Sequence, residues 1–99
     1  MDWTLIWSAR AQRELRRIHK HIAAENETAA DRLVGTILER VEAVRKVPTI
    51  GAPFRDLAGH EGRQIVVGSY RIIYAVNESL KRVEVLTVWH GARREPNLG

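Results

Sequence analysis

Two arginines and a histidine in the C-terminal half of the chain carry side chains suited to phosphate chemistry. Arg71 lies inside a predicted strand, where its guanidinium can hold a phosphate through two hydrogen bonds. Arg63 starts the preceding predicted strand and is a second candidate phosphate contact. His90 ends the last predicted strand, and the ordinary pKa of histidine suits proton transfer near neutral pH. The candidate catalytic residues are therefore Arg71, Arg63 and His90.

Each of these residues also has a structural interpretation. Arg71 could pair with Glu84 across the sheet or contact the C-terminal tail. Arg63 could be a solvated charge at a strand end, and His90 could orient the tail. The loop before Arg63 adds two weaker candidates for a general base, His60 and Glu61.

The first predicted helix carries a dense basic stretch, formed by Arg10, Arg13, Arg16, Arg17, His19, Lys20 and His21. Such a face could dock an acidic partner, although charged helix faces are also often only solvated. Two further arginines lie on the C-terminal tail. The candidate partner-binding residues are Arg10, Arg13, Arg17, Arg71, Arg93 and Arg94. We expect no metal site, because the two histidines of this helix, His19 and His21, are not at the i, i+4 spacing that paired metal ligands on a helix use. No cofactor is expected either.

The composition is that of a small globular protein. The 99 residues include 16 Lys and Arg against 12 Asp and Glu, and the net charge is +4. The hydrophobic fraction of 44% is too high for a disordered chain, and a single domain over 1–99 is expected. Cysteine is absent, which excludes disulfides and thiolate chemistry. No apolar run is long enough to span a membrane, and the N-terminus does not resemble a signal peptide, so the expected location is cytoplasmic.

Periodic apolar residues predict a helical hairpin after a short first strand. Trp3, Leu5 and Trp7 alternate as in a strand, and Ser8 follows as a helix N-cap. Apolar residues then recur at helical spacing from about 9 to 24. A second helix is predicted from Thr28, which forms a capping box with Asp31, to about residue 46, before Pro48.

The remaining chain predicts three strands. Residues 47–62 are predicted to be irregular, because glycine and proline recur throughout this stretch. Strands follow at Arg63–Val67, Tyr70–Val76 and Arg82–His90, the first two joined by a Gly68–Ser69 turn. The order β-α-α-β-β-β predicts an α+β fold with the helical hairpin packed on one face of a small antiparallel sheet and the other face partly open.

Several of these segments match a known family. The matching segments are the hairpin opening at Ser8–Ala11, the strand Gly68–Tyr74 with its Gly-Ser-Tyr-Arg-Ile-Ile-Tyr sequence, and the terminal His-Gly-Ala-Arg at His90–Arg93. The chain resembles the RelE/ParE superfamily of bacterial type II toxin–antitoxin toxins over nearly its whole length. The resemblance implies a toxin held silent by a cognate acidic antitoxin, whose C-terminal segment wraps around the toxin.

The family has two mechanisms, and the resemblance alone does not choose between them. RelE-like members cut mRNA on the ribosome with arginines, lysines and a C-terminal tyrosine. ParE-like members inhibit DNA gyrase. Here the tail Glu95–Gly99 has no tyrosine, and residues 49–62 have no lysine. We therefore favour a ParE-like gyrase inhibitor that arrests growth. The alternatives are a ribosome-dependent endoribonuclease using Arg71, Arg63 and His90, and a non-toxic binding module of the same fold.

Overall fold

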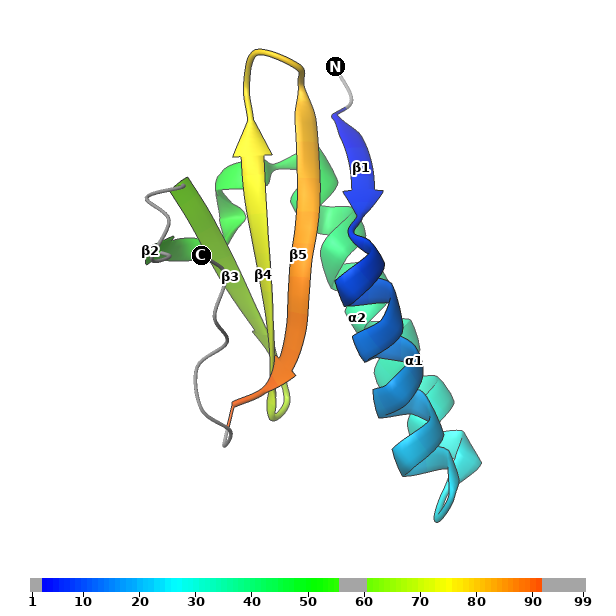
Figure 1. The fold of residues 1–99 in the computed structure, drawn as a ribbon. Helices are drawn as coiled ribbons and strands as arrows, with labels where there is room; N and C mark the ends of the chain where they lie inside the picture. Colours follow the sequence, from blue (N-terminus) through cyan, green and yellow to red (C-terminus); the bar gives the residue numbers. More distant parts are fainter. Residues whose placement is uncertain (1–2, 56–60, 92–99) are drawn as a thin grey trace.

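A computed structural model describes residues 3–55 and 61–91 and shows two helices packed on a five-stranded sheet (Figure 1). The elements follow in the order β1 Thr4–Trp7, α1 Ala9–Ala23, α2 Glu27–Lys46, a 3-10 helix Pro48–Ile50, β2 Ala52–Arg55, β3 Glu61–Val67, β4 Tyr70–Asn77 and β5 Arg82–His90. The α+β class, the helical hairpin and the three-stranded meander are confirmed. No helix within the described part of the chain is long and apolar enough to cross a membrane.

The two helices begin at side-chain caps. The Ser8 hydroxyl oxygen accepts a hydrogen bond from the amide of Ala11 at 3.0 Å, as predicted. The second helix begins at Asn26 instead of the predicted Thr28, because the Asn26 side chain accepts from the amide of Ala29 at 3.0 Å. Asparagine is among the strongest N-cap residues, so the helix starts earlier and Thr28 falls inside its first turn.

The sheet is mixed, in the order β1-β5-β4-β3-β2. The strands β2 to β5 pair antiparallel, whereas β1 pairs parallel with the first half of β5, from Thr4 opposite Arg82 to Trp7 opposite Val85. The prediction that residues 47–62 are irregular is wrong in part, because a 3-10 turn and the short strand β2 lie there. Pro53 is accommodated because β2 is an edge strand, where a missing amide hydrogen costs little.

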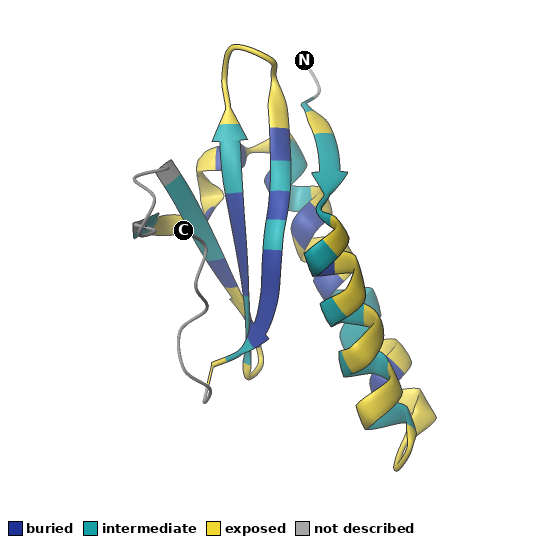
Figure 2. Ribbon diagram, in the orientation of Figure 1, coloured by how far each residue is buried: buried dark blue, intermediate teal, exposed yellow. Residues whose placement is uncertain are grey.

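The core lies between the helices and one face of the sheet (Figure 2). Its most buried members come from the two helices and from β4 and β5: Ala11, Ile37, Val41, Val44, Ile72, Tyr74, Val83, Val85 and Val88. The connection between the helices extends beyond the end of the sheet (Figure 1), so the hairpin is covered by the sheet along only part of its length.

A β-bulge in β5 decides which side chains face the helices. Tyr74 pairs with Val85 and Ile73 pairs with Thr87, so Leu86 is an extra residue on β5. Strict alternation from Val83 and Val85 would point Trp89 at the helices. The bulge reverses the alternation, so Val88 joins the core and Trp89 points away from it.

Candidate functional site

Helix α1 covers the part of β5 that β1 leaves unpaired. The pairing of β1 with β5 ends at Val85, and the Ser8 hydroxyl then donates to the carbonyl of Leu86 at 2.9 Å. One turn further on, one carboxylate oxygen of Glu14 accepts from the Thr87 hydroxyl at 2.6 Å and from the Val88 amide at 3.1 Å. The Glu14 carboxylate thus accepts hydrogen bonds from β5 where β1 no longer pairs with it, and this contact fixes α1 beside the end of β5.

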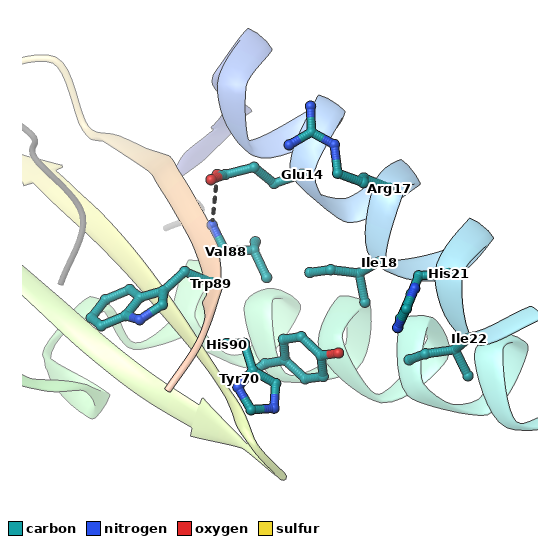
Figure 3. A pocket seen from close by; sticks show the side chains of 9 residues that line it. All are labelled: Glu14, Arg17, Ile18, His21, Ile22, Tyr70, Val88, Trp89 and His90. Atoms are coloured by element: carbon teal, nitrogen blue, oxygen red, sulfur yellow. Dashed lines mark hydrogen bonds between the residues drawn. The ribbon is translucent and has the colours of Figure 1, made fainter. Parts of the chain in front are cut away.

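Beyond Glu14, α1 and the end of the sheet enclose a groove of about 580 Å³ (Figure 3). One wall is the C-terminal half of α1, and the other is formed by the start of β4 and the end of β5. The lining residues are Glu14, Arg17, Ile18, His21, Ile22, Tyr70, Val88, Trp89 and His90.

The groove combines an apolar surface with a cationic rim. Ile18 and Ile22 line the helix side, and Tyr70 faces them from the sheet (Figure 3). The rings of Tyr70 and His90 meet edge to face, with centroids 5.2 Å apart. Arg17 and His21 are exposed on the helix side of the groove. The site therefore suits an amphipathic peptide with apolar anchors and acidic flanks.

Arg71 lies on the opposite face of the sheet from this groove. It pairs in register with Trp89, and its guanidinium carbon lies 5.7 Å from the centroid of the Trp89 ring, a cation–π contact. Glu84 pairs with Ala75 instead, so the suggested cross-strand pair between Arg71 and Glu84 is not formed. Arg71 is half-buried, and its partner is an aromatic ring.

Arg63 holds backbone groups of the segment before β2. Its guanidinium donates to the carbonyl of Gly51 at 2.7 Å and to that of Thr49 at 3.3 Å. The Tyr74 hydroxyl holds the same segment, because it donates to the carbonyl of Pro48 at 2.7 Å and accepts from the amide of Gly51 at 2.9 Å. Arg63 is therefore more than a solvated charge at a strand end, because it holds this turn in place.

Burial raises the pKa of Tyr74 above its usual value of 10.0, against the smaller opposing effects of the Gly51 amide and the Arg63 charge. A Cβ at Gly51 would lie 2.5 Å from the Tyr74 hydroxyl oxygen, so only glycine fits against this ring. Tyr74 is therefore a buried structural tyrosine.

The three candidate catalytic residues do not converge on one surface. His90 lines the groove on the helix side, whereas Arg71 lies on the far face beside Trp89. Arg63 is engaged with backbone carbonyls. Glu61 begins β3. The other candidate residues, Arg93 and Arg94 after β5 and His60 in the loop before β3, lie outside the described residues.

The basic residues of α1 divide into three groups. Arg10 forms an ion pair with Glu14 at 3.5 Å, and His19 contacts Asp31 on α2 at 2.7 Å. Arg17 and His21 line the groove. Arg13, Arg16 and Lys20 are exposed on the solvent side. Within the described residues, no group of three or more histidine or acidic side chains could hold a metal ion.

Sequence reasoning missed Glu14 and the apolar groove residues as parts of a site. Ile18 and Ile22 belong to the apolar repeat of α1, which predicts burial against the sheet. Periodicity cannot show that the sheet ends before the helix does, so it could not indicate that these two residues line a groove. Glu14 did carry a signal: it is the one acidic residue in a helix with five basic ones.

The comparisons with known proteins find the same fold in solved toxin–antitoxin structures and one matching family. The described fold is similar to the chromosomal ParDE toxin–antitoxin system from P. aeruginosa, with a TM-score of 0.73 and 20% identity over 89% of this chain and 95% of that one. It is also similar to the RelBE2 toxin–antitoxin complex from Mycobacterium tuberculosis, with a TM-score of 0.70 and 20% identity over 91% and 99% of the two chains.

A third similar structure is the intact E. coli RelBE toxin–antitoxin complex, with a TM-score of 0.57 and 26% identity over 93% and 99% of the two chains. No curated protein matches the sequence. Residues 5–95 match the family described as the ParE toxin of the type II toxin–antitoxin system parDE. This match covers most of the sequence, and the chain belongs to the ParE toxin family of type II toxin–antitoxin systems.

Proposed function

We propose that the chain arrests growth by inhibiting DNA gyrase, and that an acidic cognate antitoxin silences it by occupying the groove between α1 and the sheet. Membership of the ParE family supports the toxin role. The similar solved structures include both ParDE and RelBE systems, so the fold is shared by both branches. The choice between targets therefore depends on the site residues.

One observation favours gyrase inhibition over RNA cleavage: Arg71 and His90 face opposite sides of the sheet. Cleavage through the 2′-hydroxyl needs a base, an acid and a cationic phosphate contact around one phosphate. Arg71 and His90 lie on neighbouring strands with their side chains on opposite faces of the sheet, so the two side chains do not point toward one phosphate. One guanidinium nitrogen of Arg63 donates to two backbone carbonyls, which holds this cation at the turn before β2.

The target is tested with purified components. Supercoiling of relaxed plasmid by gyrase and cleavage of mRNA on programmed ribosomes are measured in parallel with the same toxin preparation. The proposal expects loss of supercoiling with intact mRNA. Cleaved mRNA in the ribosomal A site, abolished by Arg71→Ala, would instead establish the nuclease function, and inactivity in both assays would favour a non-toxic binding module.

The antitoxin site rests on the lining of the groove. Half-buried Ile18, Ile22 and Tyr70 provide an apolar surface, and Arg17 and His21 provide positive or protonatable rim groups for acidic flanks. An antitoxin segment that folds on binding needs such apolar anchors to offset the cost of ordering.

Co-purification with the cognate antitoxin, to be sought as a small acidic protein encoded beside the toxin gene, tests this site. Ile22→Asp places a charge inside the groove and should weaken the complex at least tenfold. Leu38→Asp is the matched control, since Leu38 is an exposed apolar residue on α2, outside the groove. If only Leu38→Asp weakens the complex, the antitoxin binds the other side of the hairpin and the groove assignment is wrong.

A further inference from the structure

The solvent face of α1 carries a line of four cations, Arg13, Arg16, Arg17 and Lys20, here called the cationic stripe. At 100° per residue they fall on one side of the helix, opposite the buried side with Ala11 and Leu15. All four are exposed, and from Arg13 to Lys20 the stripe spans about 10 Å along the axis.

The cationic stripe has no counterion within the part of the chain that the structure describes. The salt bridges of that part involve Arg10, His19 and Arg45, and none of the four stripe residues. Glu14 is the one acid in α1, and its carboxylate is turned toward Arg10, Thr87 and Val88. The partner helix α2 is balanced, with four acidic and four basic residues, so the excess charge is particular to α1.

The arrangement is unfavourable for the isolated helix. Like charges at i, i+3 and i, i+4 repel, and the stripe contains two pairs at each spacing. A bound anion would relieve this repulsion. The stripe is therefore better matched to an anionic ligand than to solvent.

The side chains around the stripe indicate the class of ligand. The large exposed hydrophobic residues of the described chain are Leu38, Val47, Ile50, Val66 and Leu80, and none lies on α1. Apolar groups lie at the two edges of the stripe, where Arg17 lines the antitoxin groove and Arg16 lines a second hollow with Trp7, Leu15 and Leu38. Between these edges, at Arg13 and Lys20, a peptide that folds on binding would find no apolar anchor. The helix itself carries no Phe, Tyr or Trp side chain on which the base of a single strand could stack. What remains is a straight row of cations, which fits the phosphates of a duplex.

We propose that the cationic stripe of α1 binds the backbone of duplex DNA, without reading its sequence. This site is distinct from the antitoxin groove, with Arg17 at the boundary between them. The inference does not depend on which target the toxin inhibits, because it rests only on the charge and composition of the α1 face.

The test is the binding of a labelled 20-base-pair DNA duplex, measured by fluorescence anisotropy at several salt concentrations. The wild-type chain should bind with a log–log salt slope of roughly −3 to −4. The variant Arg13→Gln/Lys20→Gln removes the first and last charges of the stripe, which line neither of the two neighbouring hollows. It should bind at least tenfold more weakly at 0.1 M salt, with a slope smaller by about 2.

The matched control is Arg82→Gln/Lys46→Gln, which also removes one arginine and one lysine, both exposed, from β5 and α2. It should bind like the wild type, and thermal melts of both variants confirm folding. Equal losses in the two variants would mean that net charge alone drives binding. Failure of the wild type to bind, or tighter binding of polyglutamate or RNA than of duplex DNA, would also overturn the proposal.

Discussion

Replacing Glu14 with alanine removes the side chain that fixes α1 against the unpaired end of β5. In the folded chain one carboxylate oxygen accepts from the Thr87 hydroxyl and from the Val88 amide. Thr87 is fully buried and Val88 is 1% exposed, so neither donor can turn to bulk water when the carboxylate is lost. The variant therefore leaves the Thr87 hydroxyl and the Val88 amide without their protein acceptor.

The expected loss of stability follows from these two hydrogen bonds. A hydrogen bond to a charged group contributes about 1.5–3 kcal/mol, so two set an upper range of roughly 3–6 kcal/mol. The Glu14 side chain is 20% exposed, and water entering the space left by the carboxylate recovers part of this loss. We expect the free energy of unfolding to fall by about 2 kcal/mol, which lowers the melting temperature of a chain of this size by roughly 8–16 °C.

Urea denaturation followed by circular dichroism measures this change. Arg10→Ala is the control, because it removes the surface ion pair to Glu14, whose net value is about 0.5 kcal/mol or less, and leaves both hydrogen bonds of Glu14 to β5 in place. A Glu14→Ala/Thr87→Val double-mutant cycle should show coupling between the two residues. If Glu14→Ala costs no more than Arg10→Ala, the carboxylate does not secure the strand edge and the reasoning is refuted.

Three further predictions concern other parts of the fold. Tyr74→Phe should cost about 2 kcal/mol, because the carbonyl of Pro48 and the amide of Gly51 lose their partner. Since the folded pKa of Tyr74 is raised, wild-type stability should fall as the pH rises from 10 through that folded pKa, and Tyr74→Phe should lack this component of the fall in alkaline urea titrations. Gly68→Ala should cost about 1 kcal/mol through its positive φ of 57°, and Gly68→Asn less, as read from thermal melts; equal costs would exclude backbone strain. Asp31→Asn should change stability at pH 6 by less than about 0.5 kcal/mol, since its contact with His19 is exposed, and a larger loss would show that this contact clamps the hairpin.

The helical hairpin and the meander could be predicted because local signals determine them. Apolar spacing placed both helices, and the Gly68–Ser69 turn placed β3 beside β4. The strand β2 could not be predicted in the same way. It forms because Tyr74 and Arg63, distant in sequence, hold the preceding turn beside β3, and no local pattern reports those contacts.

The candidate site was less predictable than the fold, because its geometry depends on one inserted residue. The bulge at Leu86 sends His90 to the helix side and Trp89 to the far side. Strand alternation places adjacent side chains such as these two on opposite faces, but it does not show which one faces the helices. Similarly, Arg71 was recognised as a strand arginine, while its contact with Trp89 depended on the strand register.

The most direct test of the central claim is whether the toxin traps gyrase on cleaved DNA. Purified gyrase, plasmid and ATP are incubated with the chain, and linear DNA is measured after detergent and protease treatment. We expect linear DNA to accumulate with toxin concentration and Arg71→Ala to leave this accumulation within about twofold. Prior addition of the cognate antitoxin should abolish it. Gyrase that turns over normally at saturating toxin, with no linear DNA, would contradict the account.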